Sequence, residues 1–348
     1  MHTDITFEVD CNKLKLKRKL SVAPMMDWTD RHCRYFLRGF SRHTLLYTEM
    51  ITAAAILRGD RERLLAFDPE EHPVALQLGG SDPAELARAA RAGEAAGYDE
   101  INLNCGCPSD RVARGTFGAC LMLEPERVAE CVARMRASVR VPVTVKMRVG
   151  VVTGSRNSSL ITRFDEEDFA VLHQFARRVR DAGAVAAIVH ARKAVLGGLS
   201  PKANREIPPL RFDVVQRIKA AFPDLPVVVN GGIRDQQGAL AALTWCDGVM
   251  LGREAYHRPH VLRELDEALY PADAVSVSRG ELLERMACYA ERELARGTRL
   301  SAIARHMLGL YGGQPGAREY RRFLSERSRS GDAGPQILRQ AAQAVASQ

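Results

Sequence analysis

The stretch HPVALQLGGSDPAELARAARAGEAAGYDEINLN (residues 72–104) contains the unit that decides the fold. An apolar run, 72–80, is followed by Ser81-Asp82-Pro83, which is typical of a helix start, and by an amphipathic segment that ends near Gly97. A second apolar run, 99–104, follows that glycine almost at once. The stretch therefore predicts two buried parallel strands joined by a helix.

The same alternation recurs along most of the chain. Runs rich in Val, Ile and Leu and bounded by Gly and Pro occur eight times, at 19–26, 44–50, 72–80, 99–104, 141–148, 184–192, 226–232 and 246–253. Glu124-Pro125 opens another helix, and Gly183 closes the helix expected over 165–182. Eight strand–helix repeats over about 250 residues favour a (β/α)₈ TIM barrel over an open doubly wound sheet. We expect residues 19–272 to form this α/β barrel.

The two ends of the chain differ from the barrel. Residues 277–330 show no strand pattern and predict arginine-rich helices, so we expect residues 273–348 to form an all-helical domain. Residues 1–18 form an extension before the first strand. Basic side chains gather around the end of this extension, at Lys13, Lys15, Lys17, Arg18 and Lys19.

The composition restricts the class of protein. A net charge of +8 and a pI near 9.2 fit a polyanionic partner. No apolar run is long enough to span a membrane, and the first twenty residues lack the apolar core of a signal peptide. The eight cysteines are scattered rather than patterned, which indicates reduced thiols and a cytoplasmic protein: Cys11, Cys33, Cys105, Cys107, Cys120, Cys131, Cys246 and Cys288.

Polar residues close the otherwise apolar strands. A single polar residue at a strand end is often only a loop cap, but in a barrel these ends meet at one face, where active sites lie. The set comprises Gln77, Asn102, Asn104, Lys146, Arg148, His190, Asn230 and Arg253. Because side chains alternate along a strand, Asn102 and Asn104 should face the barrel axis while Ile101 and Leu103 meet the helices.

The last two strands end in glycine turns, NGGI (230–233) and LGRE (251–254). Such turns commonly hold a phosphate in this fold because glycines expose backbone N–H groups. Lys146 could neutralise negative charge on a flavin ring, and His190 could donate a hydrogen bond to it. Together these features favour flavin mononucleotide (FMN) across the barrel mouth. No Gly-x-Gly-x-x-Gly follows the first strand, which argues against a Rossmann dinucleotide site.

Two cysteines, Cys105 and Cys107, stand one residue apart after the fourth strand. A metal site would need further Cys or His ligands at short spacing, and none lies nearby. A disulfide between the two would close a small strained ring in a reducing compartment. Ordinary core packing is the expectation for Cys33, Cys120, Cys131, Cys246 and Cys288.

Long segments of the chain closely resemble the tRNA-dihydrouridine synthases, in particular the bacterial subgroup that acts on positions 20 and 20a of the tRNA D-loop. The likeness runs from about residue 19 to 325 and is carried by APMMDWTDRHCRYFLR (23–38), LLYTEM (45–50), EEHPVALQLGGSDP (70–83), GYDEINLNCGCPSDRV (97–112), GTFGACLM (115–122), HARKAVLGGLSPKANREIPPL (190–210) and RHMLGLYGGQPGAREYRRFL (305–324). The resemblance implies a barrel with a C-terminal helical domain, FMN as cofactor, NADPH as reductant and tRNA as substrate.

The resemblance also implies roles for individual residues. Cys107, the cysteine of the Asn-x-Gly-Cys-Pro motif, would be the general acid, and Asn104 would lie near the target uridine. The flavin contacts would be Pro24, Met25, Met26, Gln77, Lys146, His190, Asn230, Gly231, Gly232, Gly252 and Arg253. The positions expected to touch tRNA are Lys202, Ala203, Arg205, Ala302 and Arg305. We expect no metal and a monomeric protein.

A cysteine suits the reaction that the resemblance implies. Hydride addition at C6 of uracil leaves negative charge on C5 and O4, and a proton must then reach C5. A thiol with an ordinary pKa of about 8.5 is mostly protonated at neutral pH yet gives up its proton readily. Cys107 is the expected donor, and Cys105 is only its neighbour. To reach this site, the base must leave its stack in the tRNA.

Two features depart from the family pattern. Cys105 occupies the variable position of the motif, where an aliphatic residue is expected, and the loop 150–169 is about ten residues longer than usual. Two other functions remain open: a flavin-dependent reductase of a free pyrimidine, like dihydroorotate dehydrogenase, and a non-catalytic RNA-binding protein. The helical domain and the basic charge count against the first, and the presence of Cys107, Lys146 and His190 counts against the second.

Overall fold

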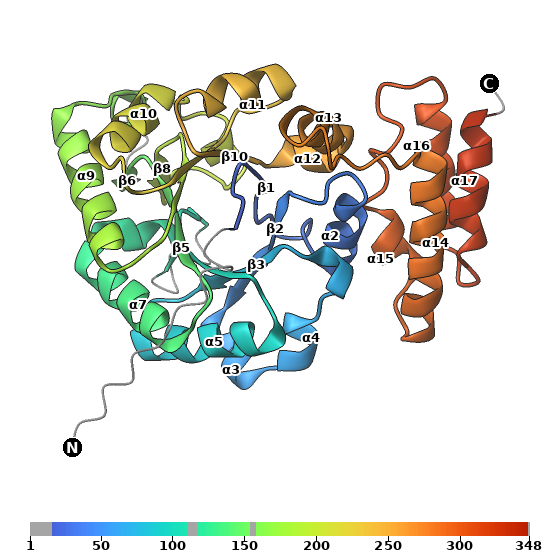
Figure 1. The fold of residues 1–348 in the computed structure, drawn as a ribbon, viewed down its shortest axis with the longest axis horizontal. Coiled ribbons are helices and arrows are strands. Elements are labelled where there is room, and N and C mark those ends of the chain that lie inside the picture. Colours follow the sequence, from blue (N-terminus) through green and yellow to red (C-terminus); the bar gives the residue numbers. More distant parts are fainter. Residues whose placement is uncertain (1–15, 110–116, 154–157, 347–348) are drawn as a thin grey trace.

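The computed structural model describes residues 16–109, 117–153 and 158–346 (Figure 1). Most of the predicted N-terminal extension, with Cys11, Lys13 and Lys15, lies outside the described residues. So does part of the loop 150–169. Every residue predicted for the functional site is described.

Eight parallel strands form a closed barrel, as predicted. Their spatial order is β1, β10, β9, β7, β5, β4, β3 and β2, which closes on β1. The strands are β1 (Leu20–Val22), β2 (Leu45–Thr52), β3 (Val74–Gly79), β4 (Glu100–Cys105), β5 (Val143–Arg148), β7 (Ala187–His190), β9 (Val227–Asn230) and β10 (Gly248–Leu251). All eight coincide with the apolar runs of the sequence, because strands buried on both faces read as continuous hydrophobic segments.

Helices cover the outside of the barrel (Figure 1). They are α2 (Arg31–Arg38), α3 (Ala53–Arg58), α4 (Arg61–Leu65), α5 (Pro83–Ala96), α7 (Pro125–Ser138), α8 (Ser158–Thr162), α9 (Glu166–Asp181), α10 (Phe212–Ala221), α11 (Gln236–Leu243), α12 (Arg253–His257) and α13 (His260–Leu269), with short 3₁₀ turns η1 (Pro69–Glu71), η2 (Gly118–Leu123) and η3 (Ala203–Arg205). The predicted caps are confirmed. Asp82 caps α5 through the N–H of Glu85, and Gly97 ends the helix with a φ of 101°.

The two faces of β4 are used as the alternation predicts. Ile101 and Leu103 point outward into the main hydrophobic core, which they share with buried side chains of the surrounding helices. Asn102 and Asn104 point inward, where they bond to side chains of neighbouring strands. The other half of the barrel interior is apolar and is filled by Ala23, Leu45, Tyr47, Ala75, Ile188, Val228 and Met250.

A small parallel sheet that the sequence did not predict lies outside the barrel. It pairs β6 (Val151–Thr153) with β8 (Ala194–Leu196). Asn204 is buried beside it, accepts from the N–H of Val195 at 2.7 Å and donates to the carbonyls of Val195 and Leu199 at 2.9 Å. These bonds fix the loop that leads to Lys202 and Arg205.

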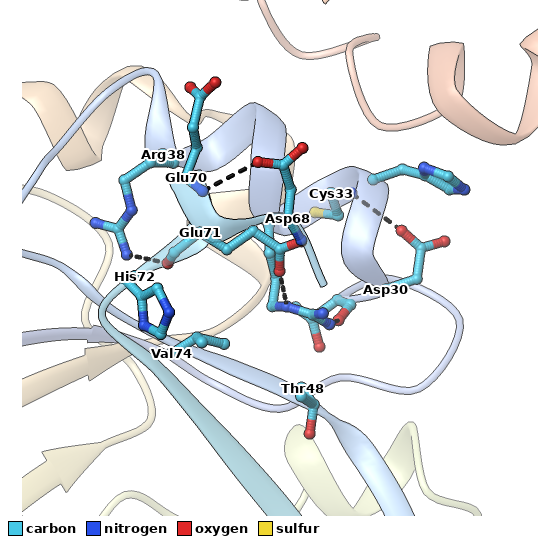
Figure 2. Close-up of polar contacts among 12 residues, drawn as sticks. Asp30, Cys33, Arg38, Thr48, Asp68, Glu70, Glu71, His72 and Val74 are labelled. Carbon is cyan, nitrogen blue, oxygen red and sulfur yellow. Dashed lines mark hydrogen bonds and ion pairs between the residues drawn. The ribbon is translucent and has the colours of Figure 1, made fainter. Parts of the chain in front are cut away.

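The segment before β3 is hydrogen-bonded to α2. Figure 2 shows the guanidinium of Arg38 donating to the carbonyl of Glu71 at 2.8 Å. Asp30 caps α2 by accepting from the N–H of Cys33 at 3.0 Å, and Asp68 accepts from the N–H of Glu70 at 3.0 Å (Figure 2). The same segment also contacts the C-terminal helices, because Arg285 pairs with Glu70 at 2.7 Å and Arg292 pairs with Asp68 at 2.9 Å.

The C-terminal region is helical and lies against one side of the barrel (Figure 1). It contains α14 (Arg279–Ala295), α15 (Leu300–Ala304), α16 (Ala317–Arg327) and α17 (Gln336–Ala346). Tyr289 of α14 stacks on Tyr35 of α2 at 4.0 Å between ring centroids, and its hydroxyl bonds to Nδ1 of His32 at 2.7 Å. The predicted boundary at 272/273 falls between α13 and α14. In the part of the chain that the structure describes, no helix is long and apolar enough to cross a membrane.

Candidate active site

The C-terminal ends of the strands bring the predicted polar residues together. Asn104 of β4 pairs in register with Lys146 of β5, and His190 of β7 pairs with Arg148 on one side and with Asn230 of β9 on the other. Four adjacent strands therefore end in one continuous polar surface at the barrel mouth. The structure places these residues as neighbours, although they span more than a third of the chain.

The mouth carries concentrated positive charge. Burial lowers the pKa of Lys146 to about 8, and Arg148 contributes to the shift. Burial also lowers the pKa of His190 well below its ordinary value, with Arg148 and Lys146 adding to the effect, so the ring is neutral at pH 7. A site whose cations lower one another's pKa in this way favours an anionic ligand.

Arg148 is the residue of this surface for which the sequence assigned no role. Its guanidinium is buried and donates to three backbone carbonyls: Gly106 at 3.0 Å, Asn204 at 3.0 Å and Lys193 at 3.2 Å. Within the described residues it has no carboxylate partner. Arg148 thus joins the loop after β4 to the loops after β7. Its position at a strand end was visible in the sequence, but its three partners were not.

The two neighbouring cysteines lie in different environments. Cys105 ends β4 with its side chain fully buried in the core, and burial raises the pKa of its thiol well above the ordinary value. Cys107 lies beyond the strand in the mouth loop and is only half-buried. Its N–H donates to Oδ1 of Asn104 at 3.0 Å, and its carbonyl accepts from the N–H of Ala119 at 2.9 Å. Only the Cys107 side of the pair is accessible to a substrate at the mouth.

The described cysteines are all free thiols. Cys33, Cys131 and Cys246 are buried as expected, and Cys120 is half-buried. Cys288 is exposed on α14, so the expectation of core packing was wrong for it, because α14 turns this face to solvent. Among the described residues no group of three or more His, Cys, Asp or Glu side chains could hold a metal ion.

The glycine turn after β9 has the geometry of an anion cradle. Gly231 and Gly232 have φ angles of 101° and 74°, which favour glycine. A Cβ at Gly231 would lie 2.5 Å from Cδ2 of His190, and one at Gly232 would lie 2.4 Å from Leu210. Within the described residues no backbone hydrogen bond uses the N–H of either glycine. Gly252 differs, with a φ of −105° and room for a Cβ, which would make only ordinary contacts with Met25 at 3.9 Å and Ala23 at 4.0 Å.

The other predicted flavin contacts also lie around the mouth. Pro24, Met25 and Met26 follow β1, and Met26 is 57% exposed. Asn230 donates to the carbonyl of Met250 at 2.8 Å, and Arg253 forms an ion pair with Glu206 at 2.9 Å. Gln77 lies deeper in the barrel, where both ends of its amide are bonded to asparagines of β4.

Comparison with known proteins places this barrel in a family. The family model described as dihydrouridine synthase (Dus) matches residues 21–347. The chain belongs to the dihydrouridine synthase family. Enzymes of this family are oxidoreductases, as the sequence predicted, and are in general flavin-dependent.

Relatives named tRNA-dihydrouridine(20/20a) synthase are similar to this dihydrouridine synthase along nearly its whole length. The protein of Xanthomonas campestris pv. campestris is 53% identical over 93% of both chains. That of Pseudomonas aeruginosa is 54% identical over 89% of this chain and 90% of its own. That of Synechocystis is 52% identical over 93% of this chain and 94% of its own. The likeness covers the barrel and the helical region together.

The residues predicted to touch tRNA lie in two places. Lys202 and Arg205 are exposed around η3, and Ala203 between them is half-buried. Ala302 and Arg305 belong to the helical region, but Arg305 turns back to the barrel, donates to the carbonyl of Asp27 and pairs with Asp30 at 3.5 Å. Arg305 therefore connects the helical region of this dihydrouridine synthase to the loop after β1.

The arginines of the helical region fall into two groups, those that form ion pairs and those that do not. Several are engaged in ion pairs, namely Arg285, Arg292, Arg296 and Arg305. Three others on α16 are exposed and form no ion pair with any residue that the structure describes. These are Arg318, Arg321 and Arg322. The sequence could not separate the two groups, because arginine content alone does not reveal partners.

Proposed function

We propose that the chain reduces D-loop uridines of tRNA to 5,6-dihydrouridine, at positions 20 and 20a, with FMN as cofactor and NADPH as reductant. One observation carries the proposal: a half-buried cysteine, Cys107, lies at a cationic barrel mouth that also carries the glycine turn after β9. The names of the full-length relatives support tRNA as the substrate and the positions. They also favour this function over reduction of a free pyrimidine or RNA binding alone.

The residues of the mouth fit FMN. The N–H groups of Gly231 and Gly232, which make no backbone hydrogen bond with any described residue, would hold its phosphate, with Arg253 adding charge from α12. Lys146 and His190 would face the ring system, where an ammonium stabilises negative charge. Gln77, Asn230, Gly252 and the Pro24–Met26 turn would complete the contacts. Bound FMN would supply a hydride from its N5 to C6 of uracil.

The protein's own chemical contribution is a proton. Addition at C6 places negative charge on C5 and O4 of the uracil, and the Cys107 thiol would deliver its proton to C5. Asn104 would position the base, and the nearby cations would stabilise the charge on O4. Cys105 cannot take this role, because its side chain faces the core on the other side of the strand.

Two basic surfaces would hold the tRNA on either side of the mouth. One is the loop with Lys202, Ala203 and Arg205, and the other is the helical region with Ala302, Arg305 and the exposed arginines of α16. Phosphate contacts of this kind would supply most of the affinity. We propose that residues 19–272 form the catalytic domain, that residues 273–348 form the tRNA-binding domain, and that the protein acts as a cytoplasmic monomer without a metal.

Replacing both Lys202 and Arg205 by alanine should weaken tRNA binding in a salt-dependent manner. Each lost phosphate contact should lower the slope of log K against log salt by about one. The control is the double replacement of Arg88 and Arg91, which are exposed on α5 away from the mouth. Filter binding over a salt series measures the effect. If NADPH-driven flavin reduction fell together with tRNA binding, the loop would belong to the cofactor site instead.

The affinity of the apoprotein for FMN should fall as the pH rises through about 8, because Lys146 then loses its proton. Losing one charge-assisted contact should cost about tenfold in affinity. Fluorescence titrations between about pH 7 and about pH 9.5 measure this, below the pKa of ordinary lysines. Lys146→Met should bind weakly at every pH and show no such step. The same step in that variant would assign it to another group.

The cofactor proposal has a direct test. Purified protein should be yellow and should release FMN on denaturation. A colourless protein that cannot be reconstituted with FMN would remove the flavin-dependent reaction from consideration.

A further inference from the structure

A continuous chain of buried polar side chains runs through the barrel below the active site. Every second residue of β4, namely Glu100, Asn102 and Asn104, faces the interior, and Gln77 of β3 and Thr144 of β5 lie beside them. All five are buried. Polar groups in a barrel interior that could be filled by aliphatic side chains call for an explanation.

The hydrogen bonds of this chain all point in one direction. Asn104 donates from Nδ2 to Oε1 of Gln77 at 2.8 Å, and Gln77 donates from Nε2 to Oδ1 of Asn102 at 2.8 Å. Asn102 donates from Nδ2 to Oγ1 of Thr144 at 2.8 Å. Thr144 in turn donates to Oε1 of Glu100 at 2.6 Å. This hydrogen-bond chain therefore ends on the carboxylate of Glu100.

The carboxylate sets this direction. A carboxylate that pairs with an arginine acts as an acceptor, so the single hydroxyl proton of Thr144 points to Glu100, and Thr144 must then accept from Asn102. That requirement fixes the orientation of the Asn102 amide, then that of Gln77 and then that of Asn104. Oδ1 of Asn104 is left facing the mouth. A reversed chain would turn the NH₂ group of Asn104 toward the mouth loop.

Two further side chains contact the Glu100 carboxylate from the N-terminal side of the barrel. Arg18, just before β1, pairs with Oε2 of Glu100 at 2.7 Å. Tyr47 of β2 donates to Oε1 at 2.5 Å. Burial raises the pKa of Tyr47 well above its ordinary value, so its hydroxyl remains a donor. Tyr47 contacts the same carboxylate oxygen as Thr144 and lies within hydrogen-bond reach of the Thr144 hydroxyl, but it forms no hydrogen bond with the amides of Asn102, Gln77 or Asn104.

The end of this hydrogen-bond chain at the barrel mouth holds the loop that carries Cys107. Oδ1 of Asn104 accepts from the N–H groups of Gly106 at 3.1 Å and Cys107 at 3.0 Å. Both bonds require an acceptor at that point, because two N–H groups converge on it. A reversed Asn104 amide would present donors to donors and release this turn.

We propose that Glu100 and Thr144 are positioning residues, which act through Asn102, Gln77 and Asn104 to hold the backbone of Cys107 in place for proton delivery. The catalytic part of this inference rests on the proposed function, whereas the structural part does not. A displacement of about 1 Å at a reacting group can cost up to about a hundredfold in rate. Glu100 and Thr144, deep in the barrel, would thus affect the rate of the reaction at its mouth.

The test compares Thr144→Val with Tyr47→Phe in the FMN-loaded protein. Each variant removes one buried hydroxyl donor to the same oxygen of Glu100, so both should lower thermal stability to a similar extent. Only Thr144→Val interrupts the hydrogen-bond chain between Asn102 and Glu100. Hydrogen–deuterium exchange at Gly106 and Cys107, measured by mass spectrometry, should become about tenfold faster in Thr144→Val and should not change in Tyr47→Phe.

Single-turnover reduction of tRNA uridine by the NADPH-reduced enzyme is the second measurement. It should slow by about tenfold in Thr144→Val. FMN content and tRNA affinity should be retained. Thr144→Ser, which keeps the hydroxyl, should restore both the exchange protection and the rate. Glu100→Gln, which removes the fixed acceptor, should behave like Thr144→Val and provides a second test if that variant does not fold.

The outcomes separate this inference from the proposed function. Equal effects of Thr144→Val and Tyr47→Phe on exchange and rate would overturn the inference, because they would reflect general loosening of the barrel. Unchanged exchange at Gly106 and Cys107 in both Thr144→Val and Glu100→Gln would overturn it as well. A selective change in exchange in a protein that never reduces uridine would instead refute the proposed function.

Discussion

Replacing Cys107 by alanine should abolish most uridine reduction while leaving reduction of the flavin by NADPH intact. In the proposed reaction NADPH would reduce the flavin before the uridine enters, so that half of the reaction would need no proton from Cys107. Loss of the general acid should slow the second half by about 10²- to 10⁴-fold. Stopped-flow measurement of each half-reaction separates the two effects.

Cys105→Ala is the matched control for that experiment. Its thiol is buried in the core, so the substitution should lower thermal stability modestly and leave both half-reactions near their wild-type rates. If Cys105→Ala abolished uridine reduction and Cys107→Ala did not, the assignment of the proton donor would be wrong.

Replacing Gly231 by alanine should weaken FMN binding by about ten- to a hundredfold. A residue with a Cβ is strained at a φ of 101°, and the added atom would lie 2.5 Å from Cδ2 of His190. Relief of that contact must move either the phosphate cradle or the histidine, and both face the proposed cofactor. Fluorescence titration of the apoprotein with FMN measures the loss.

Gly183→Ala provides the same backbone strain far from the mouth. Gly183 follows α9 with a φ of 96°, and a Cβ there would meet Cγ of Arg136 at 3.4 Å, an ordinary contact. This variant should lose stability but bind FMN normally. Equal loss of FMN affinity in Gly183→Ala and Gly231→Ala would show that global destabilisation, rather than the cradle, controls the cofactor.

The barrel was predictable because its strands are buried on both faces and its helices carry local caps. The unit at 72–104 shows this, since its strand residues, its Asp82 cap and its Gly97 terminator all appear in the structure as the sequence indicated. The β6–β8 sheet was not predictable. Its strands are only three residues long, and they pair with each other across more than forty residues of sequence. Asn204, nine residues after Val195, holds β8 through its side chain.

The site was predictable to the level of strand ends but not of partners. The alternation along β4 placed Asn102 and Asn104 inside the barrel, and the same rule extends to Glu100, although a carboxylate needs a partner there. That partner, Arg18, precedes β1 and is more than eighty residues away in sequence. The engagement of Arg305 with Asp27 and Asp30 depends on tertiary packing in the same way, so no local pattern could reveal it.

The most direct test of the proposed function is to incubate the FMN-loaded protein and NADPH with an unmodified tRNA that has uridines at positions 20 and 20a. Mass spectrometry of nuclease fragments then locates the dihydrouridine. We predict dihydrouridine at positions 20 and 20a, dependent on Cys107, and no reduction of free uridine monophosphate. Reduction of the free nucleotide, or an unmodified tRNA despite a fully reduced flavin, would contradict the proposal.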